Sequence, residues 1–136
     1  MADCIFCMLA NGQIPTATLY EDEKFRAILD ASPASKGHCL ILPKAHYEDA
    51  LAMPDELLGE AHVTAKKVAD RMMKALGCDG INIVQNNKEA AGQTVFHFHI
   101  HIIPRYKNDG EMVSWKPGEL TDVAKNDILE SFAKTE

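Results

Sequence analysis

The sequence predicts an α+β fold, in which a five-stranded antiparallel sheet packs against one long helix, with short helices near both ends of the chain. Three observations predict it. Five short apolar runs lie between clusters of turn-forming residues, as strands do. One long segment repeats apolar residues at three- and four-residue steps, the period of a helix. The connections are short, and 136 residues suit one domain spanning residues 1–136.

The predicted elements follow one another without a linker. They are a helix over residues 3–12, strands over 17–20, 24–29 and 38–42, a long helix over 54–76, strands over 80–86 and 97–103, and a short helix over about 121–133. Asp3 suits the start of the first helix, and Asn11-Gly12 suits its end. Pro43 and Pro104 are expected to end two of the strands.

The long helix over residues 54–76 has recognisable ends. Pro54 suits the first turn, and Asp55 and Glu56 lie near the positive end of the helix dipole. Gly77 is the expected stop. The apolar stripe between them indicates core packing or a subunit interface. Near the C-terminus, Trp115 is expected to cover the core or an interface.

The segment His97-Phe98-His99-Ile100-His101-Ile102-Ile103 has three of the six histidines spaced by two. On a strand, side chains alternate between faces, so the three imidazoles share one face and the apolar residues pack the other. A chance row of solvent-facing histidines is one interpretation. The functional interpretations are a metal site or nucleophilic phosphate chemistry, because neutral imidazole is both a ligand and a nucleophile.

Other polar residues have both structural and functional interpretations. The pair Cys4 and Cys7 has three interpretations: a redox-active pair, half of a zinc site, or an incidental pair. The redox interpretation is disfavoured, because no strand precedes the pair as one does in thioredoxin-like proteins. Asp30 precedes Ser32-Pro33 and suits a turn equally well. Alone, His46 indicates a surface histidine. Gln93 and Thr94 lead into the histidines and suit either a turn or an anion site.

Composition excludes several classes of protein. The formal net charge of −6 argues against a nucleic-acid or anionic-membrane surface, whereas a nucleotide can be bound by local amides and imidazoles. No apolar run reaches the roughly 20 residues of a membrane span, and no signal peptide is evident. We therefore expect a cytoplasmic protein with reduced cysteines. No carboxylate cluster or glycine-rich phosphate loop predicts a catalytic magnesium site.

These motifs together resemble the histidine triad (HIT) family, most closely the small bacterial branch related to adenosine phosphoramidate hydrolases. The resemblance runs nearly end to end. Its residues are the Cys-Ile-Phe-Cys start, Asp30 before Ser32-Pro33, Gly37-His38, Pro43-Lys44-Ala45-His46, Asn86, Gly92-Gln93 and the triad.

The resemblance implies a nucleotide site and a covalent mechanism. His99 matches the nucleophile that forms a nucleotidyl-histidine intermediate, and His101 matches a phosphate-contacting histidine. Asp30 matches the aspartate that holds the ribose hydroxyls. Phosphate or leaving-group contacts are implied for Asn86, Gln93 and Thr94, and apolar walls around the base for Phe6, Ile28 and Leu40.

The resemblance also implies a structural zinc ion held by Cys4, Cys7, His46 and His97, and a two-fold homodimer. A Cys2His2 set leaves no open coordination position, so such a site is structural. The function expected is hydrolysis of purine nucleoside phosphoramidates to the monophosphate. The alternatives are a dinucleoside polyphosphate hydrolase or phosphorylase, and a nucleotide-binding regulatory protein with incidental turnover.

Overall fold

A computed structural model describes residues 3–110 and 116–135. The element order is α1 (Ile5–Ala10), β1 (Thr18–Glu21), β2 (Phe25–Leu29), β3 (Cys39–Pro43), the 3₁₀ turn η1 (Ala50–Ala52), α2 (Asp55–Leu76), β4 (Gly80–Val84), the 3₁₀ turn η2 (Glu89–Ala91), β5 (Ile100–Arg105) and α3 (Asp122–Ala133). Trp115 lies outside the described residues.

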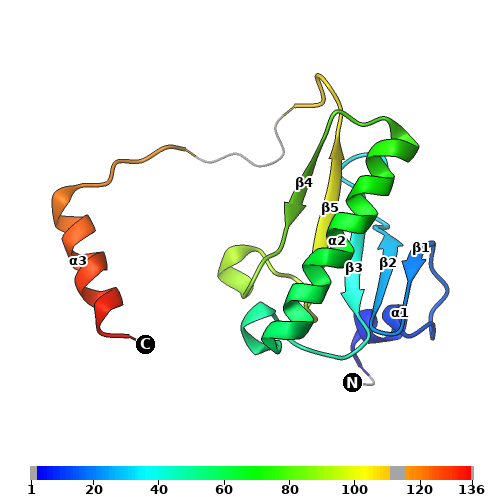
Figure 1. The fold of residues 1–136 in the computed structure, drawn as a ribbon, viewed down its shortest axis with the longest axis horizontal. Helices are drawn as coiled ribbons and strands as arrows, with labels where there is room; N and C mark the ends of the chain where they lie inside the picture. The colour runs from blue at the N-terminus through cyan, green and yellow to red at the C-terminus, as the bar shows by residue number, and fades with distance from the viewer. Residues whose placement is uncertain (1–2, 111–115, 136) are drawn as a thin grey trace.

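The five strands form one antiparallel sheet in the order β1-β2-β3-β5-β4. Figure 1 shows α2 lying along one face of this sheet, with α1 near the ends of the first strands and α3 apart from the sheet. The predicted fold class is confirmed. No described helix is long and apolar enough to cross a membrane.

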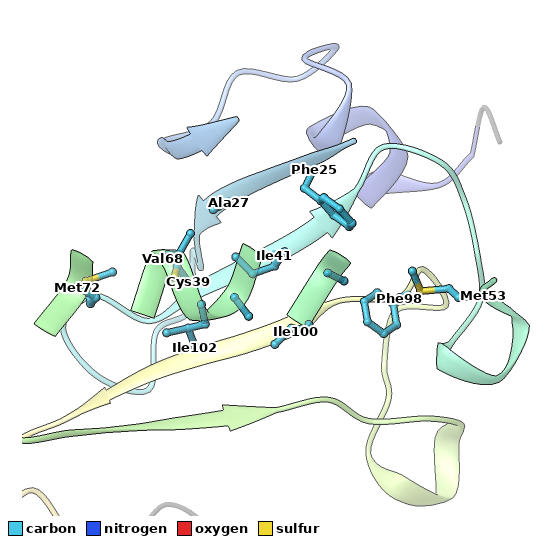
Figure 2. Close-up of a cluster of buried hydrophobic side chains, with 12 residues drawn as sticks. Phe25, Ala27, Cys39, Ile41, Met53, Val68, Met72, Phe98, Ile100 and Ile102 are labelled. Atoms are coloured by element: carbon cyan, nitrogen blue, oxygen red, sulfur yellow. The ribbon is translucent and has the colours of Figure 1, made fainter. Parts of the chain in front are cut away.

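The main core lies between the sheet and α2. Strand side chains alternate, so every second residue of the inner strands faces the helix. Figure 2 shows these side chains interleaved with the apolar stripe of α2. The fully or nearly buried members are Phe25, Ala27, Cys39, Ile41, Met53, Ala61, Ala65, Val68, Met72, Phe98, Ile100 and Ile102.

A second, smaller apolar cluster lies on the opposite face of the sheet, beneath α1. Ile28, Leu40 and Leu42 supply the strand side chains, and Ala10 supplies the helix. Next to them in sequence, Ala27 of β2 and Cys39 and Ile41 of β3 belong to the main core against α2. The period of two therefore divides each strand between two faces, and α1 covers only part of its face.

The histidine segment departs from its predicted limits. β5 begins at Ile100, because Ile41 opposite Ile100 is the last residue of β3 that pairs with it. Nearer the N-terminus of the segment, the Phe98 amide donates instead to the carbonyl of Tyr47, which is not in a strand. Pro104 does not end the strand, which continues to Arg105 paired with β4. Pro104 is tolerated because β3 no longer pairs with β5 there, so no partner needs its missing N–H.

The helix ends agree with the sequence in part. Gly77 takes the left-handed conformation at the end of α2, as expected. Pro54 was expected in the first turn of the long helix, but it is the cap residue before it, because α2 begins at Asp55. Asp3 does not cap α1; Cys4 does, with its sulfur accepting the Cys7 amide at 3.3 Å.

Candidate functional site

A pocket of about 410 Å³ opens on the α1 face of the sheet. Its volume falls in the ordinary range for small-molecule sites. Its walls are mostly apolar, with a carboxylate and two imidazoles among them. The lining residues are Phe6, Leu9, Pro15, Thr16, Ile28, Leu29, Asp30, Ala31, Leu40, Thr94, Val95, His99 and His101.

A larger hollow, of about 710 Å³, lies between α2 and the turn that joins β1 to β2. It is lined mainly by surface carboxylates and lysines, with none of the triad histidines. The smaller pocket is the better candidate because its apolar walls lie beside two of the triad histidines, His99 and His101.

His99 has its ring fixed by the backbone. Its Nδ1 lies 2.7 Å from the carbonyl oxygen of His97, and a carbonyl only accepts, so Nδ1 holds the proton. Burial lowers the pKa of His99 below its ordinary value. The ring is therefore neutral at pH 7, with the lone pair on Nε2. This is the form of imidazole that acts as a nucleophile.

His101 lies beside His99, with ring centroids 5.0 Å apart. Burial, and the neighbouring His99 and His38, lower the pKa of His101 to about 4. Nδ1 of His101 lies 2.9 Å from Nε2 of His38, which is buried. His38 was not predicted as a site residue. Its signals in the sequence were its place between a glycine turn and an apolar strand, and the match of Gly37-His38 to the family pattern, which assigned it no role.

Asp30 serves both the turn and the pocket. One carboxylate oxygen accepts the Ser32 amide at 2.8 Å, which fixes the turn after β2. The other lies 3.5 Å from His38 Nε2. Asp30 also lines the pocket, so both interpretations of this residue agree with its position.

The apolar positions expected around a base gather at one side of the pocket. Phe6 comes from α1, Ile28 from β2 and Leu40 from β3. The Phe6 ring meets His99 edge-on, with centroids 4.9 Å apart. These three side chains approach from separate elements because α1 lies across β2 and β3.

Two of the residues expected to contact the phosphate or the leaving group do not line the pocket. Gln93 is buried, and its side chain is committed to the backbone: it accepts from the Lys88 amide at 2.7 Å and donates to the carbonyls of Glu48 at 2.6 Å and Val95 at 3.0 Å. Asn86 is half-buried away from the lining. Thr94, next to Gln93, does line the pocket. Gln93 thus fixes the loop that presents Thr94.

A Cys/His cluster lies next to the pocket. The ligand atoms of Cys4, Cys7, His46 and His97 all lie within 4.8 Å of one another. Nδ1 of His97 is 3.5 Å from the Cys4 sulfur and 3.4 Å from the Cys7 sulfur, and Nδ1 of His46 is 3.3 Å from the Cys7 sulfur. Tetrahedral zinc with ordinary bond lengths separates sulfur and nitrogen ligands by about 3.5 Å. The cluster therefore fits such an ion.

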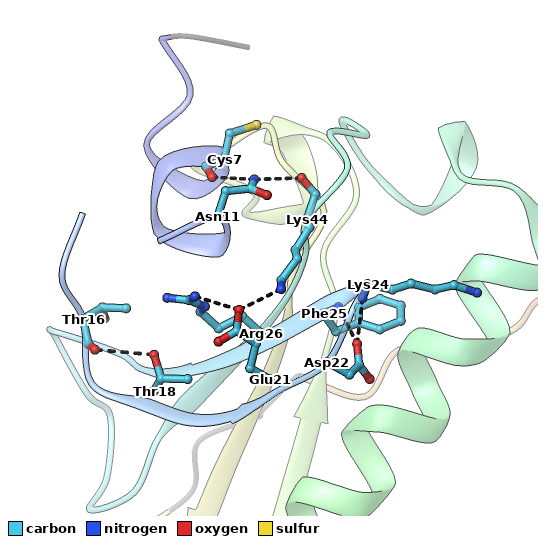
Figure 3. Close-up of polar contacts among 10 residues, drawn as sticks. All are labelled: Cys7, Asn11, Thr16, Thr18, Glu21, Asp22, Lys24, Phe25, Arg26 and Lys44. Carbon is cyan, nitrogen blue, oxygen red and sulfur yellow. Dashed lines mark hydrogen bonds and ion pairs between the residues drawn. The ribbon is translucent and has the colours of Figure 1, made fainter. Parts of the chain in front are cut away.

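Local structure prepares this cluster. The His97 Nε2–H donates to the Pro43 carbonyl at 2.8 Å, which leaves the Nδ1 lone pair facing the sulfurs. Burial lowers the pKa of His97 to about 4. Figure 3 shows the Asn11 amide bridging the carbonyls of Cys7 and Lys44, at 2.8 and 3.0 Å. That bridge ties the end of α1 to the chain that leads to His46.

A second group of potential ligands comprises Asp30, His38 and His101. Here the two imidazole nitrogens face each other at 2.9 Å and hydrogen-bond directly. Their lone pairs do not converge on a common point, so hydrogen bonding explains this group.

The fold and the pocket define an α+β protein with a histidine nucleophile candidate beside a Cys/His cluster that could hold a metal ion. Comparisons with known proteins then identify the family. The model of the HIT domain matches residues 11–108. The chain therefore belongs to the HIT family, whose members bind or hydrolyse nucleotides.

Three similar proteins illustrate the relationship. An uncharacterized HIT-like protein of Methanocaldococcus jannaschii is 48% identical over 129 residues, covering 95% of this chain and 98% of its own. The adenosine 5′-monophosphoramidase HNT1 of Saccharomyces cerevisiae is 41% identical, covering 91% and 76%. The crystal structure of a zinc-bound histidine triad family protein from Mycobacterium smegmatis has a TM-score of 0.77 and 33% identity, covering 98% and 95%.

Proposed function

We propose that this protein hydrolyses purine nucleoside phosphoramidates, or related nucleoside 5′-phosphate derivatives, to the nucleoside monophosphate. The observation that carries the proposal is the contact of His99 Nδ1 with the His97 carbonyl oxygen, which places the ring proton on Nδ1. The Nδ1–H is held by the His97 carbonyl at 2.7 Å, so the Nε2 lone pair is available beside an apolar, nucleotide-sized pocket.

The proposed reaction has two displacements. Nε2 of His99 attacks the α-phosphorus, the bond from phosphorus to the leaving nitrogen breaks, and the amine departs with a proton supplied by water. Water then attacks the nucleotidyl-histidine, which releases the monophosphate and restores neutral His99. The covalent route divides one difficult displacement into two easier ones.

The pocket supplies the contacts that this substrate class needs. Phe6, Ile28 and Leu40 offer an apolar slot for the base, and Asp30 offers a carboxylate for the ribose hydroxyls. His101 and Thr94 offer donors to the phosphate. The similarity to a yeast adenosine 5′-monophosphoramidase supports the same substrate class.

The first experiment is release of AMP from adenosine 5′-phosphoramidate by the wild-type protein and His99→Ala. We expect turnover by the wild type, loss of about a thousandfold or more in the variant, and retained AMP binding. His62→Ala, an exposed histidine on α2, is the matched control and should be fully active. Wild-type activity in His99→Ala would contradict the mechanism.

Side-by-side assays separate the alternatives. A diadenosine polyphosphate turned over much faster than the phosphoramidate would favour the polyphosphate hydrolase. Tight AMP binding with negligible turnover of both substrates would favour a regulatory protein. A quench at alkaline pH should trap adenylyl-histidine, because phosphorus–nitrogen bonds of this kind are labile to acid, and peptide mapping should locate the adduct on His99.

We further propose a structural Zn²⁺ held by Cys4, Cys7, His46 and His97, and no catalytic metal. The sulfur–nitrogen separations support the zinc site, and so does the zinc-bound relative. When bound, the ion would tie α1 to the loop that precedes β5. Metal analysis of the purified protein should find about one zinc per chain.

A homodimer in the cytoplasm is the proposed working form. β4 is an edge strand that exposes Ile83, and α3 exposes Val123, Ile128, Leu129 and Phe132. Covering such apolar surface and pairing an open edge are common reasons for self-association. Light scattering after size-exclusion chromatography should give twice the chain mass of 15.0 kDa.

A further inference from the structure

His38 and His101 form an imidazole pair of which only His101 lines the pocket. Their ring centroids are 5.2 Å apart. His101 lies on β5, directly opposite Leu40 of β3, and His38 immediately precedes β3. The sheet register therefore brings the two rings together from positions 63 residues apart in the sequence.

The turn before β3 holds His38 in place. Gly37 has a φ of +95°, a backbone conformation that L side chains rarely adopt, and a Cβ there would also press on the Leu76 side chain at 2.5 Å, so any other residue would be strained. The His38 amide donates to the Ser35 carbonyl at 3.2 Å. The ring is thus held by a closed turn on one side and by β5 on the other.

The direction of the hydrogen bonds follows from the backbone. The Ala34 amide, which can only donate, lies 2.9 Å from Nδ1 of His38. That nitrogen must therefore be the acceptor. Burial lowers the pKa of His38, so the ring is neutral and its single proton lies on Nε2. The Asp30 carboxylate, 3.5 Å from Nε2, also favours a proton there.

The position of the ring proton on His38 then determines which nitrogen of His101 is protonated. His38 Nε2–H donates to Nδ1 of His101 at 2.9 Å, so the neutral His101 ring must hold its proton on Nε2. His101 Nε2 has no hydrogen bond to the described residues. It is nevertheless not a buried atom without a partner, since Nε of Arg26 is the only such side-chain atom among the described residues. His101 Nε2 is therefore accessible, and because His101 lines the pocket, this nitrogen is open to it.

We propose that His38 is a positioning residue that fixes His101 as the Nε2–H tautomer, and so makes His101 a donor to an α-phosphate oxygen. The ligand in this statement rests on the proposed function. No proton is transferred: as His99 attacks and the leaving group departs, negative charge grows on the phosphoryl oxygens, and a fixed neutral donor stabilises it. The other tautomer would turn a lone pair toward those oxygens.

The two neighbouring imidazoles would then have opposite tautomers for opposite tasks. The His97 carbonyl makes His99 a lone-pair nucleophile, and His38 makes His101 a donor. Each tautomer is set before substrate binds, so neither ring needs to reorganise during the reaction. Such preorganisation is a large part of electrostatic catalysis.

The first test reads the tautomers directly, by ¹⁵N–¹H correlation spectra of the imidazoles in the full-length protein at neutral pH. In the wild type, His101 should show a protonated Nε2 and His99 a protonated Nδ1. In His38→Phe, which keeps a ring but has no donor, the His101 nitrogens should shift toward a mixture of tautomers. A protonated Nδ1 on His101 in the wild type would overturn the proposal.

The second test is turnover of adenosine 5′-phosphoramidate. His38→Phe should lower kcat by about tenfold to a hundredfold, less than loss of an oxyanion donor itself. His38→Gln should recover most of this loss, because glutamine has both an acceptor oxygen and an amide donor. Wild-type kcat in His38→Phe, despite a changed tautomer, would overturn the catalytic role.

Failure of the proposed function would remain distinguishable. If the wild type releases no AMP, the phosphoramidase proposal fails, while the His101 spectra still decide whether His38 sets the tautomer. Circular dichroism of each variant checks folding. If His38→Phe does not fold, the wild-type and His38→Gln spectra decide the proposal.

Discussion

The Nδ1–H of His99 donates to the backbone carbonyl of His97 at 2.7 Å, while the His97 side chain belongs to the Cys/His cluster. The proposed nucleophile and a proposed metal ligand are thus two residues apart and directly hydrogen-bonded. Anything that moves the His97 backbone also changes the orientation of the His99 ring. The metal site and the reaction site are therefore coupled through one peptide group.

Removal of zinc should destabilise the protein without abolishing the chemical step. A strong chelator is expected to lower the thermal midpoint by roughly 10 °C, because a structural ion stabilises the folded chain. AMP release should decline only in part, through looser placement of His99. Calorimetry and activity are measured together, before and after zinc is returned.

The matched variants are Cys7→Ser, within the cluster, and Cys78→Ala, a buried cysteine outside it. Only Cys7→Ser should lose bound zinc. A prompt loss of all activity that magnesium alone restores would contradict a purely structural ion.

Gln93→Ala should act first on stability. It removes the partner of the Lys88 amide and of the carbonyls of Glu48 and Val95. Leaving such groups unpaired costs about 2 kcal/mol in the free energy of unfolding. The loop that presents Thr94 should loosen, which raises KM more than it lowers kcat.

Urea unfolding and steady-state kinetics measure these two effects. Gln85→Ala is the control, because among the described residues its amide bonds only with Asn86 and Asn87, which are its neighbours in the sequence. An unchanged unfolding free energy in Gln93→Ala would show that its hydrogen bonds contribute nothing to the fold.

Stability should fall as the pH drops from about 6.5 toward 4. Burial, His99 and His38 lower the pKa of His101 from 6.5 to about 4. In this window the unfolded chain binds the proton and the folded chain does not, so acid favours unfolding. Below about pH 4 this contribution is exhausted, and above 6.5 it is fully present.

Urea midpoints between pH 4 and pH 8 measure this effect. His101→Gln has no imidazole at that position and should show a shallower dependence than the wild type. Identical slopes in the two proteins would mean that His101 titrates alike in the folded and unfolded states.

Asp30→Asn should weaken AMP binding by roughly tenfold. The variant keeps one oxygen for the Ser32 amide and loses the carboxylate expected to hold the ribose hydroxyls; a hydrogen bond to a charged group contributes about 1.5–3 kcal/mol. Binding of 2′,3′-dideoxy-AMP should change little. Calorimetric titration of both nucleotides measures the difference.

Asp70→Asn is the control, because Lys74, on the exposed side of α2, is the one partner of Asp70 within the part of the chain that the structure describes. Equal losses for AMP and the dideoxy analogue in Asp30→Asn would assign Asp30 to the turn alone.

Much of the fold followed from local pattern. The stripe of α2, its end at Gly77, and the alternation that buries Phe98, Ile100 and Ile102 all agree with the structure. These features depend on side-chain period and on local backbone preference, which sequence displays directly. That residues 1–136 form one domain stays a prediction.

The strand limits did not follow. β5 begins and ends where its neighbours pair with it, three residues after His97 and one after Pro104. Pairing is a property of two strands far apart in the chain, so neither limit is present in the local sequence.

The sequence by itself determined the fold class, the alternation of histidine and apolar residues, and the candidate ligands and nucleophile. Only the tertiary structure decided that Gln93 bonds to backbone and that His38 meets His101. The physical reason is that chemistry depends on proton positions and hydrogen-bond partners. Those are fixed by strand register and loop closure, which bring together groups that the sequence keeps far apart.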